Sequence, residues 1–218
     1  LRLVVLDSAN ACDDFAFPGP FAKAYESQMA RLSALTDGAD SSWLISHRPI
    51  WAVKDFKSAK DDTGCTEDNA DACINQTLQA ALNMGADGAL PSSVKLVLSG
   101  HMHRFQSVTF SKGDRPPMIV VGTGGTQLDA KNRVGAFEAT VQGVRANVLT
   151  TAAFLETEKT SALTPAFGYL SLNYLGGGAW HGKLTNPALH WADCGSDLAE
   201  KGSVCALTSG VKAWGRSE

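Results

Sequence analysis

The chain has 218 residues, of which 44% are hydrophobic and 19% charged, and its formal net charge is −3. This balance is ordinary for a globular domain with a sizeable core. Nucleic acid is not an expected partner, because binding to a phosphate backbone needs clustered Lys and Arg. No membrane partner is expected either, since no apolar run approaches the roughly 18–20 residues of a spanning helix.

Apolar runs and helical spacing alternate along the first hundred residues. The predicted elements, in chain order, are a strand over 2–6, a helix over 21–35, a strand over 42–46, a helix over 69–84 and a strand over 94–98. The first strand is almost wholly apolar, which is typical of a strand buried on both faces. Gly85 is expected to end the second helix. Strands and helices that alternate in this way indicate an α/β fold with a layered sheet.

From residue 105 onward the pattern changes to short strands joined by turns, which predicts β-hairpins. These strands cover 105–110, 118–121, 134–140, 144–149, 167–174, 180–184 and 189–191, with a polar, threonine-rich connection over 150–165. We expect residues 1–150 to form one layered unit. Residues 151–218 are expected to form a β-rich extension of the same domain.

Three of the five histidines stand where predicted strands end. His47 follows the strand over 42–46, and Gly100-His101-Met102-His103 follows the strand over 94–98. Open α/β sheets build their sites at the carboxyl ends of strands. If the backbone is extended, His101 and His103 point to the same side, with Cβ atoms about 6–7 Å apart. Each imidazole could then bind a different ion of a metal pair about 3.5–4 Å apart. We predict that all three are metal ligands.

Three further sets of polar residues have less specific interpretations. Arg104 is a candidate for contacting a substrate phosphate, since a guanidinium matches phosphate oxygens. Strand alternation points it away from His103, which favours a surface position or one behind the metal ligands. His181 and His190 adjoin tryptophans, and we expect them to be packing or surface residues. Asn75 begins a glycosylation sequon, which is weak support for secretion.

Four of the five cysteines lie in two close pairs. Cys65 and Cys73 share one polar segment, and Cys194 and Cys205 flank another. Local disulfides within each pair imply an oxidising, extracytoplasmic compartment, whether secreted, periplasmic or lumenal. The alternative is five unrelated buried thiols, which the polar neighbours disfavour. Cys12 is left over, and it either pairs outside this sequence or stays free.

The order of these motifs resembles a known family. Ser46-His47-Arg48-Pro49 followed by Gly100-His101-Met102-His103 resembles the second half of the calcineurin-like metallophosphoesterases. The stretches 43–51 and 120–126 resemble the purple-acid-phosphatase-like branch of that superfamily. The resemblance covers most of residues 1–150 and, more loosely, 167–207. It implies part of a layered α/β/β/α sandwich with C-terminal β-hairpins.

By this resemblance the parent protein is a dinuclear metal-dependent phosphoesterase. A hydroxide bridging two metal ions would attack the phosphorus of a small-molecule or protein phosphate ester. His47 and His101 would bind one ion and His103 the other. The ions would be divalent or trivalent Fe, Zn or Mn. Their identity stays open, because imidazole suits zinc, iron and several other metals, and the missing carboxylates would help decide.

The family's N-terminal motifs are missing from this sequence. D-x-H and G-N-H do not occur; Asp7-Ser8-Ala9 has Ala where the family has His, and no Asn-His dipeptide exists. The family's general acid would come from the G-N-H segment, so no catalytic acid is assigned. We interpret the chain as the C-terminal half of a longer phosphoesterase, completed by an N-terminal segment of the same protein and inactive alone.

Two other hypotheses remain open. The chain could be a non-catalytic binding or assembly module derived from the same fold. It could also hold a single structural zinc, with His47, His101 and His103 joined by water or a carboxylate.

Overall fold

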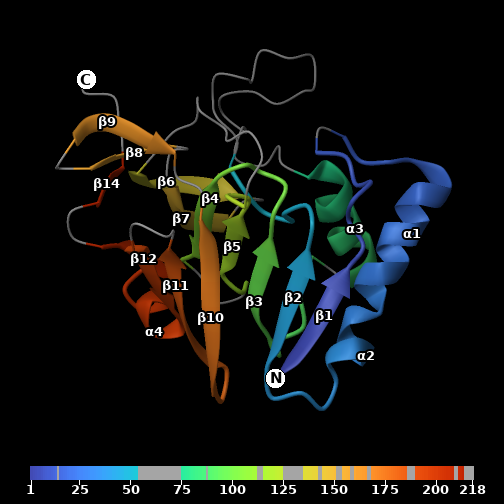
Figure 1. Cartoon of the computed structure of the whole chain (residues 1–218). Helices are drawn as coiled ribbons and strands as arrows, with labels where there is room; N and C mark the ends of the chain where they lie inside the picture. Colours follow the sequence, from blue (N-terminus) through green and yellow to red (C-terminus); the bar gives the residue numbers. More distant parts are fainter. Residues whose placement is uncertain are drawn as a thin grey trace.

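A seven-stranded mixed sheet organises the molecule. The computed structural model describes residues 1–13, 15–53, 75–86, 88–111, 115–124, 135–141, 144–150, 154–157, 160–165, 168–185, 190–208 and 211–213. The strands of the large sheet are β1 (Arg2–Leu6), β2 (Ser42–Ser46), β3 (Val94–Ser99), β4 (Phe105–Phe110), β5 (Met118–Val121), β6 (Gly135–Val141) and β7 (Val144–Thr150). Their order is β1-β2-β3-β5-β4-β7-β6. The chain is therefore a mixed α/β protein, as the sequence predicts (Figure 1).

The direction of the strands changes across this sheet. β1, β2, β3 and β5 are parallel, whereas β4, β6 and β7 pair antiparallel. Except for β5, which was predicted among the hairpin strands, the parallel part corresponds to the alternating strands and helices of the first half of the sequence. The antiparallel part corresponds to the predicted hairpins, because antiparallel strands can be joined by short turns.

Three helices accompany the parallel strands: α1 (Gly19–Ala30), α2 (Leu32–Thr36) and α3 (Gln76–Ala86). The single helix predicted over 21–35 is thus interrupted at Arg31. The prediction that Gly85 ends the second helix is wrong, because α3 continues through it. A Cβ at Gly85 would lie 2.4 Å from the backbone oxygen of Glu26, so this glycine lets α3 approach α1 closely. The start predicted at residue 69 lies outside the described residues.

The remaining strands form two smaller antiparallel sheets. One contains β10 (Tyr169–Gly176), β11 (Ala179–Thr185), β12 (His190–Gly195) and β13 (Cys205–Leu207), with the short helix α4 (Ser196–Ala199) between the last two. The other contains β14 (Val211–Ala213), β8 (Phe154–Thr157) and β9 (Thr160–Pro165). The polar, threonine-rich connection predicted over 150–165 contains two strands that were not predicted, β8 and β9. Thr is common in strands, so its abundance there indicated β-structure as much as a loop.

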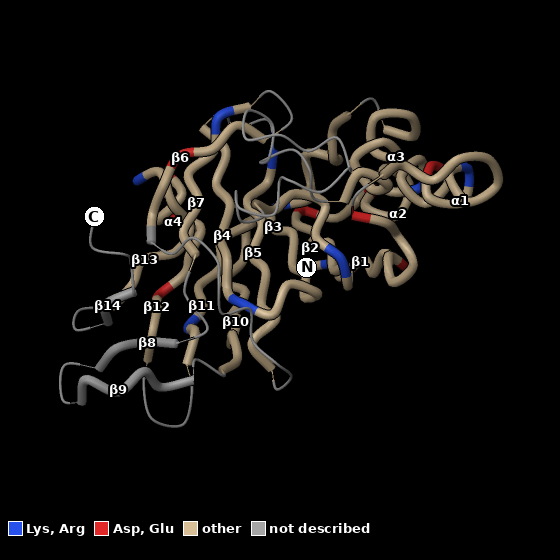
Figure 2. The backbone as a smooth tube through the Cα atoms, turned by 90° about the horizontal axis from the view of Figure 1, so that it is seen from above, with Lys and Arg blue, Asp and Glu red and all other residues tan. Residues whose placement is uncertain are grey.

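The seven-stranded sheet has a different apolar core on each face. One core joins the sheet to the helices through residues such as Leu44, Met29 and Leu82. The other joins it to the four-stranded sheet through residues such as Trp43 and Trp180. Figure 2 looks down on the strand ends and shows the helices and the four-stranded sheet on different sides of the large sheet. Residues from both predicted ranges, 1–150 and 151–218, share the second core.

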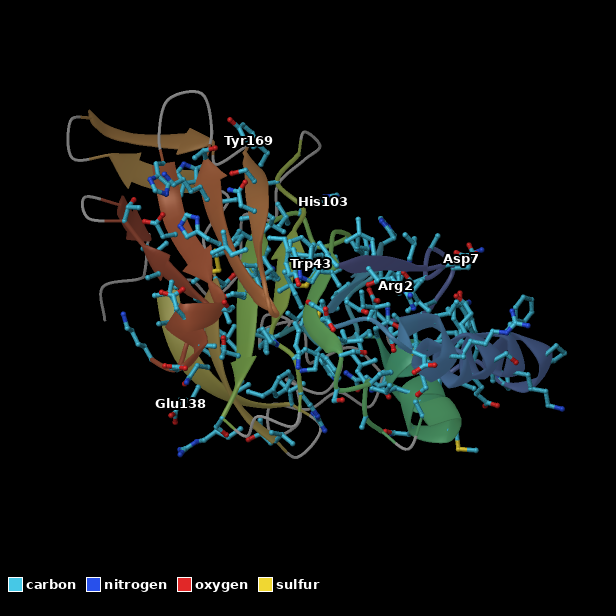
Figure 3. All side chains as sticks on the ribbon, turned by 90° about the horizontal axis from the view of Figure 1, so that it is seen from below. Arg2, Asp7, Trp43, His103, Glu138 and Tyr169 are labelled. Carbon is cyan, nitrogen blue, oxygen red and sulfur yellow. A yellow bond between two sulfur atoms is a disulfide. The ribbon has the colours of Figure 1, made fainter. Side chains whose placement is uncertain are left out.

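β1 differs from its prediction. Among the described residues it pairs only with β2, so it is an edge strand. Val4 and Leu6 are buried against the helices, but Leu3 is 57% exposed and Val5 76% exposed. The prediction that both faces are buried is wrong, because the four-stranded sheet does not extend over this strand. Figure 3 shows Arg2 and Asp7 at the β1 end of the molecule, away from Tyr169 and the four-stranded sheet.

One of the two predicted disulfides is present. Cys194 and Cys205 face each other in register on β12 and β13 and are bonded. The sequence shows these two cysteines only as flanking a polar segment, whereas the structure places them on paired strands. Cys12 is a free thiol, and Cys65 and Cys73 lie outside the described residues.

We expect this disulfide to stabilise the second core. It closes a loop with a sequence separation of 11 residues, for which the loss of unfolded-state entropy corresponds to about 2–4 kcal/mol. The double variant C194A/C205A should therefore lose stability by about that amount in urea unfolding. A double-variant midpoint equal to that of the oxidised wild type would contradict the assignment.

Candidate functional site

The carboxyl ends of β1, β2 and β3 meet along one edge of the sheet. Leu6 is opposite Ser46, and Ser46 is opposite Ser99, so all three strands end at the same level. The loops that follow are joined directly, because the Gly100 N–H donates to the His47 carbonyl (3.0 Å). The predicted strand-end position of these histidines is thus what the structure shows.

The segment after β3 is not extended. The Met102 N–H donates to the Gly100 carbonyl, and the Arg104 N–H donates to the Met102 carbonyl, each at 2.8 Å. These bonds close two successive three-residue turns. His101, at the centre of the first, has a φ of 66°. The prediction that His101 and His103 share one side of an extended backbone is therefore wrong, because the chain turns at each of them.

Gly122 fixes the position of this turn. A Cβ at Gly122 would lie 1.7 Å from the Met102 carbonyl oxygen. The Gly122 N–H also donates to the Arg104 carbonyl (3.0 Å). The end of β5 can approach the histidine turn this closely only because residue 122 has no side chain.

His47 and His101 come together at the sheet edge. Their ring centroids are 5.2 Å apart, at an interplanar angle of 68°. Partial burial, with His101 and Arg48 beside it, lowers the pKa of His47 below its usual value. His103 contributes in the same direction, so it lies within electrostatic reach of His47. A lowered pKa favours the neutral imidazole, which is the form that binds metals.

Asp13, which sequence reasoning missed, contacts His101 and the neighbouring Arg48. Its Oδ2 lies 2.9 Å from His101 Nε2, and its Oδ1 lies 3.0 Å from Arg48 Nη1. Burial raises the pKa of the Asp13 carboxyl, but the hydrogen bond with His101 and the electrostatic effects of His101 and Arg48 outweigh it, so the net pKa is lowered. Asp13 is therefore an ionised acceptor at the same edge of the sheet.

The N-terminal end of α3 holds Asp13 in place. Asn75 is completely buried, donates from Nδ2 to Asp13 Oδ1 (3.1 Å), and accepts the Leu78 N–H on its own Oδ1. The Gln76 N–H donates to the Asp13 carbonyl (3.0 Å). Because both ends of the Asn75 side chain are engaged inside the protein, it is not an accessible glycan acceptor.

The other predicted polar residues lie elsewhere. Arg104 is only 4% exposed, so it is not a surface residue, and its contact with a substrate phosphate stays a prediction. His190 Nε2 lies 3.2 Å from Asp193 Oδ1, and His181 Nε2 lies 3.9 Å from the same oxygen, all on partly exposed side chains of the four-stranded sheet. These two histidines are surface residues away from His47.

The donor chemistry at the sheet edge suits a metal ion, whereas the number of donors does not suit a pair of ions. Neutral imidazoles and a carboxylate are ordinary ligands of Zn and Fe. Within the described part of the chain, however, no three His, Cys, Asp or Glu side chains stand close enough to hold an ion as a set. We therefore derive no catalytic step through a metal pair.

Comparison with known proteins gives little beyond this geometry. No family model and no curated protein matches the chain. A solved structure described as GAP50, the anchor in the inner membrane complex of Plasmodium, is 14% identical with a TM-score of 0.38. The match covers 96% of this chain and 49% of that one, so the chain spans about half its length. A likeness this weak establishes no shared activity. None of the helices in the described ranges is long and apolar enough to cross a bilayer.

The close approach at Gly122 gives a testable prediction. Gly122→Ala places a methyl group against the Met102 carbonyl and should lower the free energy of unfolding by at least about 1–3 kcal/mol, the usual cost of overpacking. Gly124→Ala is the matched control, because a Cβ there meets nothing within 4 Å. Equal urea midpoints for the two variants would contradict the assigned role of Gly122.

Proposed function

We propose that this chain is part of a dinuclear metal-dependent phosphoesterase of the calcineurin-like superfamily, in its purple-acid-phosphatase-like branch. His47, His101 and His103 are the proposed metal ligands, and a small-molecule or protein phosphate ester is the proposed substrate. The observation that carries the proposal is the meeting of His47 and His101 at the carboxyl edge of β2 and β3. That edge is where open α/β sheets place their sites.

The proposal requires donors from another polypeptide segment. When bound, the ions would polarise the phosphoryl oxygens and supply a hydroxide nucleophile. The described residues offer one side of such a site, so the bridging carboxylate and the general acid would come from an N-terminal segment of the same protein. The four-layer α/β/β/α sandwich belongs to the same proposal, and the two cores of the large sheet support it.

An extracytoplasmic location is also proposed. The bond between Cys194 and Cys205 is consistent with it, because disulfides persist mainly in oxidising compartments. The secreted, periplasmic and lumenal possibilities share this chemistry.

A non-catalytic assembly module is the second candidate, and the exposed face of β1 favours it. Parallel strands are ordinarily covered on both faces, yet Leu3 and Val5 are exposed. β10 is the neighbouring edge of the four-stranded sheet, and its Tyr174 ring packs 6.3 Å from Trp43 on β2. Because strands in a sheet are about 4.8 Å apart, a strand added to β10 would lie over β1. An amphipathic strand from another polypeptide would cover both.

The phosphoesterase proposal predicts metal binding at the strand ends. In calorimetric titration with Zn²⁺, H47Q and H101Q should each weaken binding on the order of 100-fold or more, exceeding the roughly 10–100-fold cost of losing an outer partner. H181Q and H190Q are the controls, because these imidazoles lie on the four-stranded sheet.

The corresponding activity test uses the protein from its natural source. It should hydrolyse a simple phosphate monoester only with metal present, and H101Q should abolish turnover, whereas H181Q should not. Zinc affinity that depends on His181 and His190 but not on His47 and His101 would contradict the proposed site.

The assembly candidate makes a separate prediction about β1. V5K should leave the stability of the isolated chain within about 0.5 kcal/mol, as expected for an exposed position. In the protein from its natural source it should dissociate the covering polypeptide, seen as a smaller sedimentation coefficient and faster amide exchange in β1. M84K is the control, because Met84 is similarly exposed at 73% on α3. Fast β1 exchange in the native protein, unchanged by V5K, would rule out a covering strand.

A further inference from the structure

The Asp13 carboxylate is bound by the two unusual backbone positions of the described chain. Among the described residues, Asn75 (φ 51°) and His101 (φ 66°) are the non-glycine residues with positive φ. The side-chain nitrogens of both residues contact the Asp13 carboxylate: Asn75 Nδ2 lies 3.1 Å from Oδ1, and His101 Nε2 lies 2.9 Å from Oδ2. Positive φ costs energy for residues with a side chain and persists where surrounding contacts impose it. Two such positions that converge on one carboxylate mark it as the centre of a prearranged site.

The carboxylate has little freedom to move away. The backbone carbonyl of Asp13 accepts the Gln76 N–H. The backbone N–H of the preceding residue, Cys12, donates to Thr77 Oγ1 (3.2 Å). Asn75 is completely buried, and the Asp13 side chain is 15% exposed. The start of α3 therefore aims Asp13 at the imidazole of His101 from a fixed position.

The location of the proton on His101 follows from these contacts. An ionised carboxylate can only accept a hydrogen bond, so the nitrogen 2.9 Å from it must carry the hydrogen. Arg48 Nη1 carries two hydrogens and lies 2.8 Å from the same Nε2. One hydrogen has an acceptor in Asp13 Oδ1 at 3.0 Å, and an Nε2 that accepted the other would face the anionic Asp13 Oδ2 at 2.9 Å with no hydrogen between them. Arg48 and His101 are thus two donors that share one carboxylate, and Nε2 has no lone pair to offer.

We infer that Asp13 is a positioning residue that fixes His101 in the Nε2–H tautomer, which leaves Nδ1 as the nitrogen that binds metal. The inference rests on the proposed function for its metal, although the tautomer itself does not depend on it. Hydrogen-bonding one imidazole nitrogen to a carboxylate is a general way to orient the other toward a metal. Asp13 also brings a negative charge that partly offsets Arg48 beside the site.

The alternative is that Asp13, Arg48 and His101 form only an ion-pair network that ties loops together. The two interpretations differ in a measurable way. A structural network contains the same Asp13–His101 contact and would fix the same tautomer, but it does not require any effect of Asp13 on metal affinity.

The experiment is long-range ¹H–¹⁵N NMR of the imidazoles in the metal-free chain, at about pH 8.5 where an ordinary histidine is neutral. His101 should show a protonated Nε2 and an unprotonated Nδ1 in the wild type. D13N should populate both tautomers, because an amide can donate as well as accept. D193N, which alters the separate Asp193–His190 pair, should leave the His101 signals unchanged.

Zinc titration completes the test. D13N should lower Zn²⁺ affinity about 10–100-fold, as expected for an outer partner of a ligand, whereas D13E should restore part of it. A wild-type His101 protonated on Nδ1, or a D13N variant with wild-type tautomer and affinity, would overturn the inference. If the wild type binds no Zn²⁺ at these histidines but shows the Nε2–H tautomer that D13N changes, the positioning role stands and the proposed function fails.

Discussion

The Asp13 carboxylate connects four parts of the chain that are far apart in sequence. The loop after β1 supplies the carboxylate, Arg48 follows β2, His101 follows β3, and Asn75 immediately precedes α3. Hydrogen bonds to charged groups each contribute about 1.5–3 kcal/mol. A positive φ at a non-glycine residue costs about 1–3 kcal/mol. The free energy contributed by the contacts of Asp13 is thus large enough to hold Asn75 and His101 in backbone conformations that neither would adopt alone.

The rest of the site depends on how closely the neighbouring backbone can pack. The histidine turn lies against Gly122, where no side chain fits, and against the His47 carbonyl, which accepts the Gly100 N–H. Met102, between the two histidines of the motif, is buried at 6% exposure and anchors the turn to the core. The same sheet is open at β1, so the strand next to this site has a face and an edge that another polypeptide could cover. The proposed catalytic role and the proposed assembly role therefore concern adjacent surfaces of one sheet.

Part of this arrangement was predictable from sequence, because it depends on local patterns. Apolar runs identified β1, β2 and β3, and the rule that sites form at carboxyl strand ends placed His47 and His101 together. The extended geometry expected for His101 and His103 failed because the turn depends on Gly122, about twenty residues later in the chain. An apolar run also cannot distinguish a central strand from an edge strand, which is why the sequence predicts two buried faces for β1. Asp13 was missed because its position is fixed by contacts with the start of α3, not by any local periodicity.

We propose that the strand-end histidines form a metal site whose geometry is set by Asp13. The most direct measurement is a crystal structure of the protein from its natural source, with anomalous diffraction recorded at the zinc absorption edge after Zn²⁺ addition. We expect an anomalous peak within bonding distance of His47 and of His101 Nδ1, with Asp13 still in contact with Nε2. A peak at His181, His190 and Asp193 instead, or zinc bonded to His101 Nε2, would contradict the account.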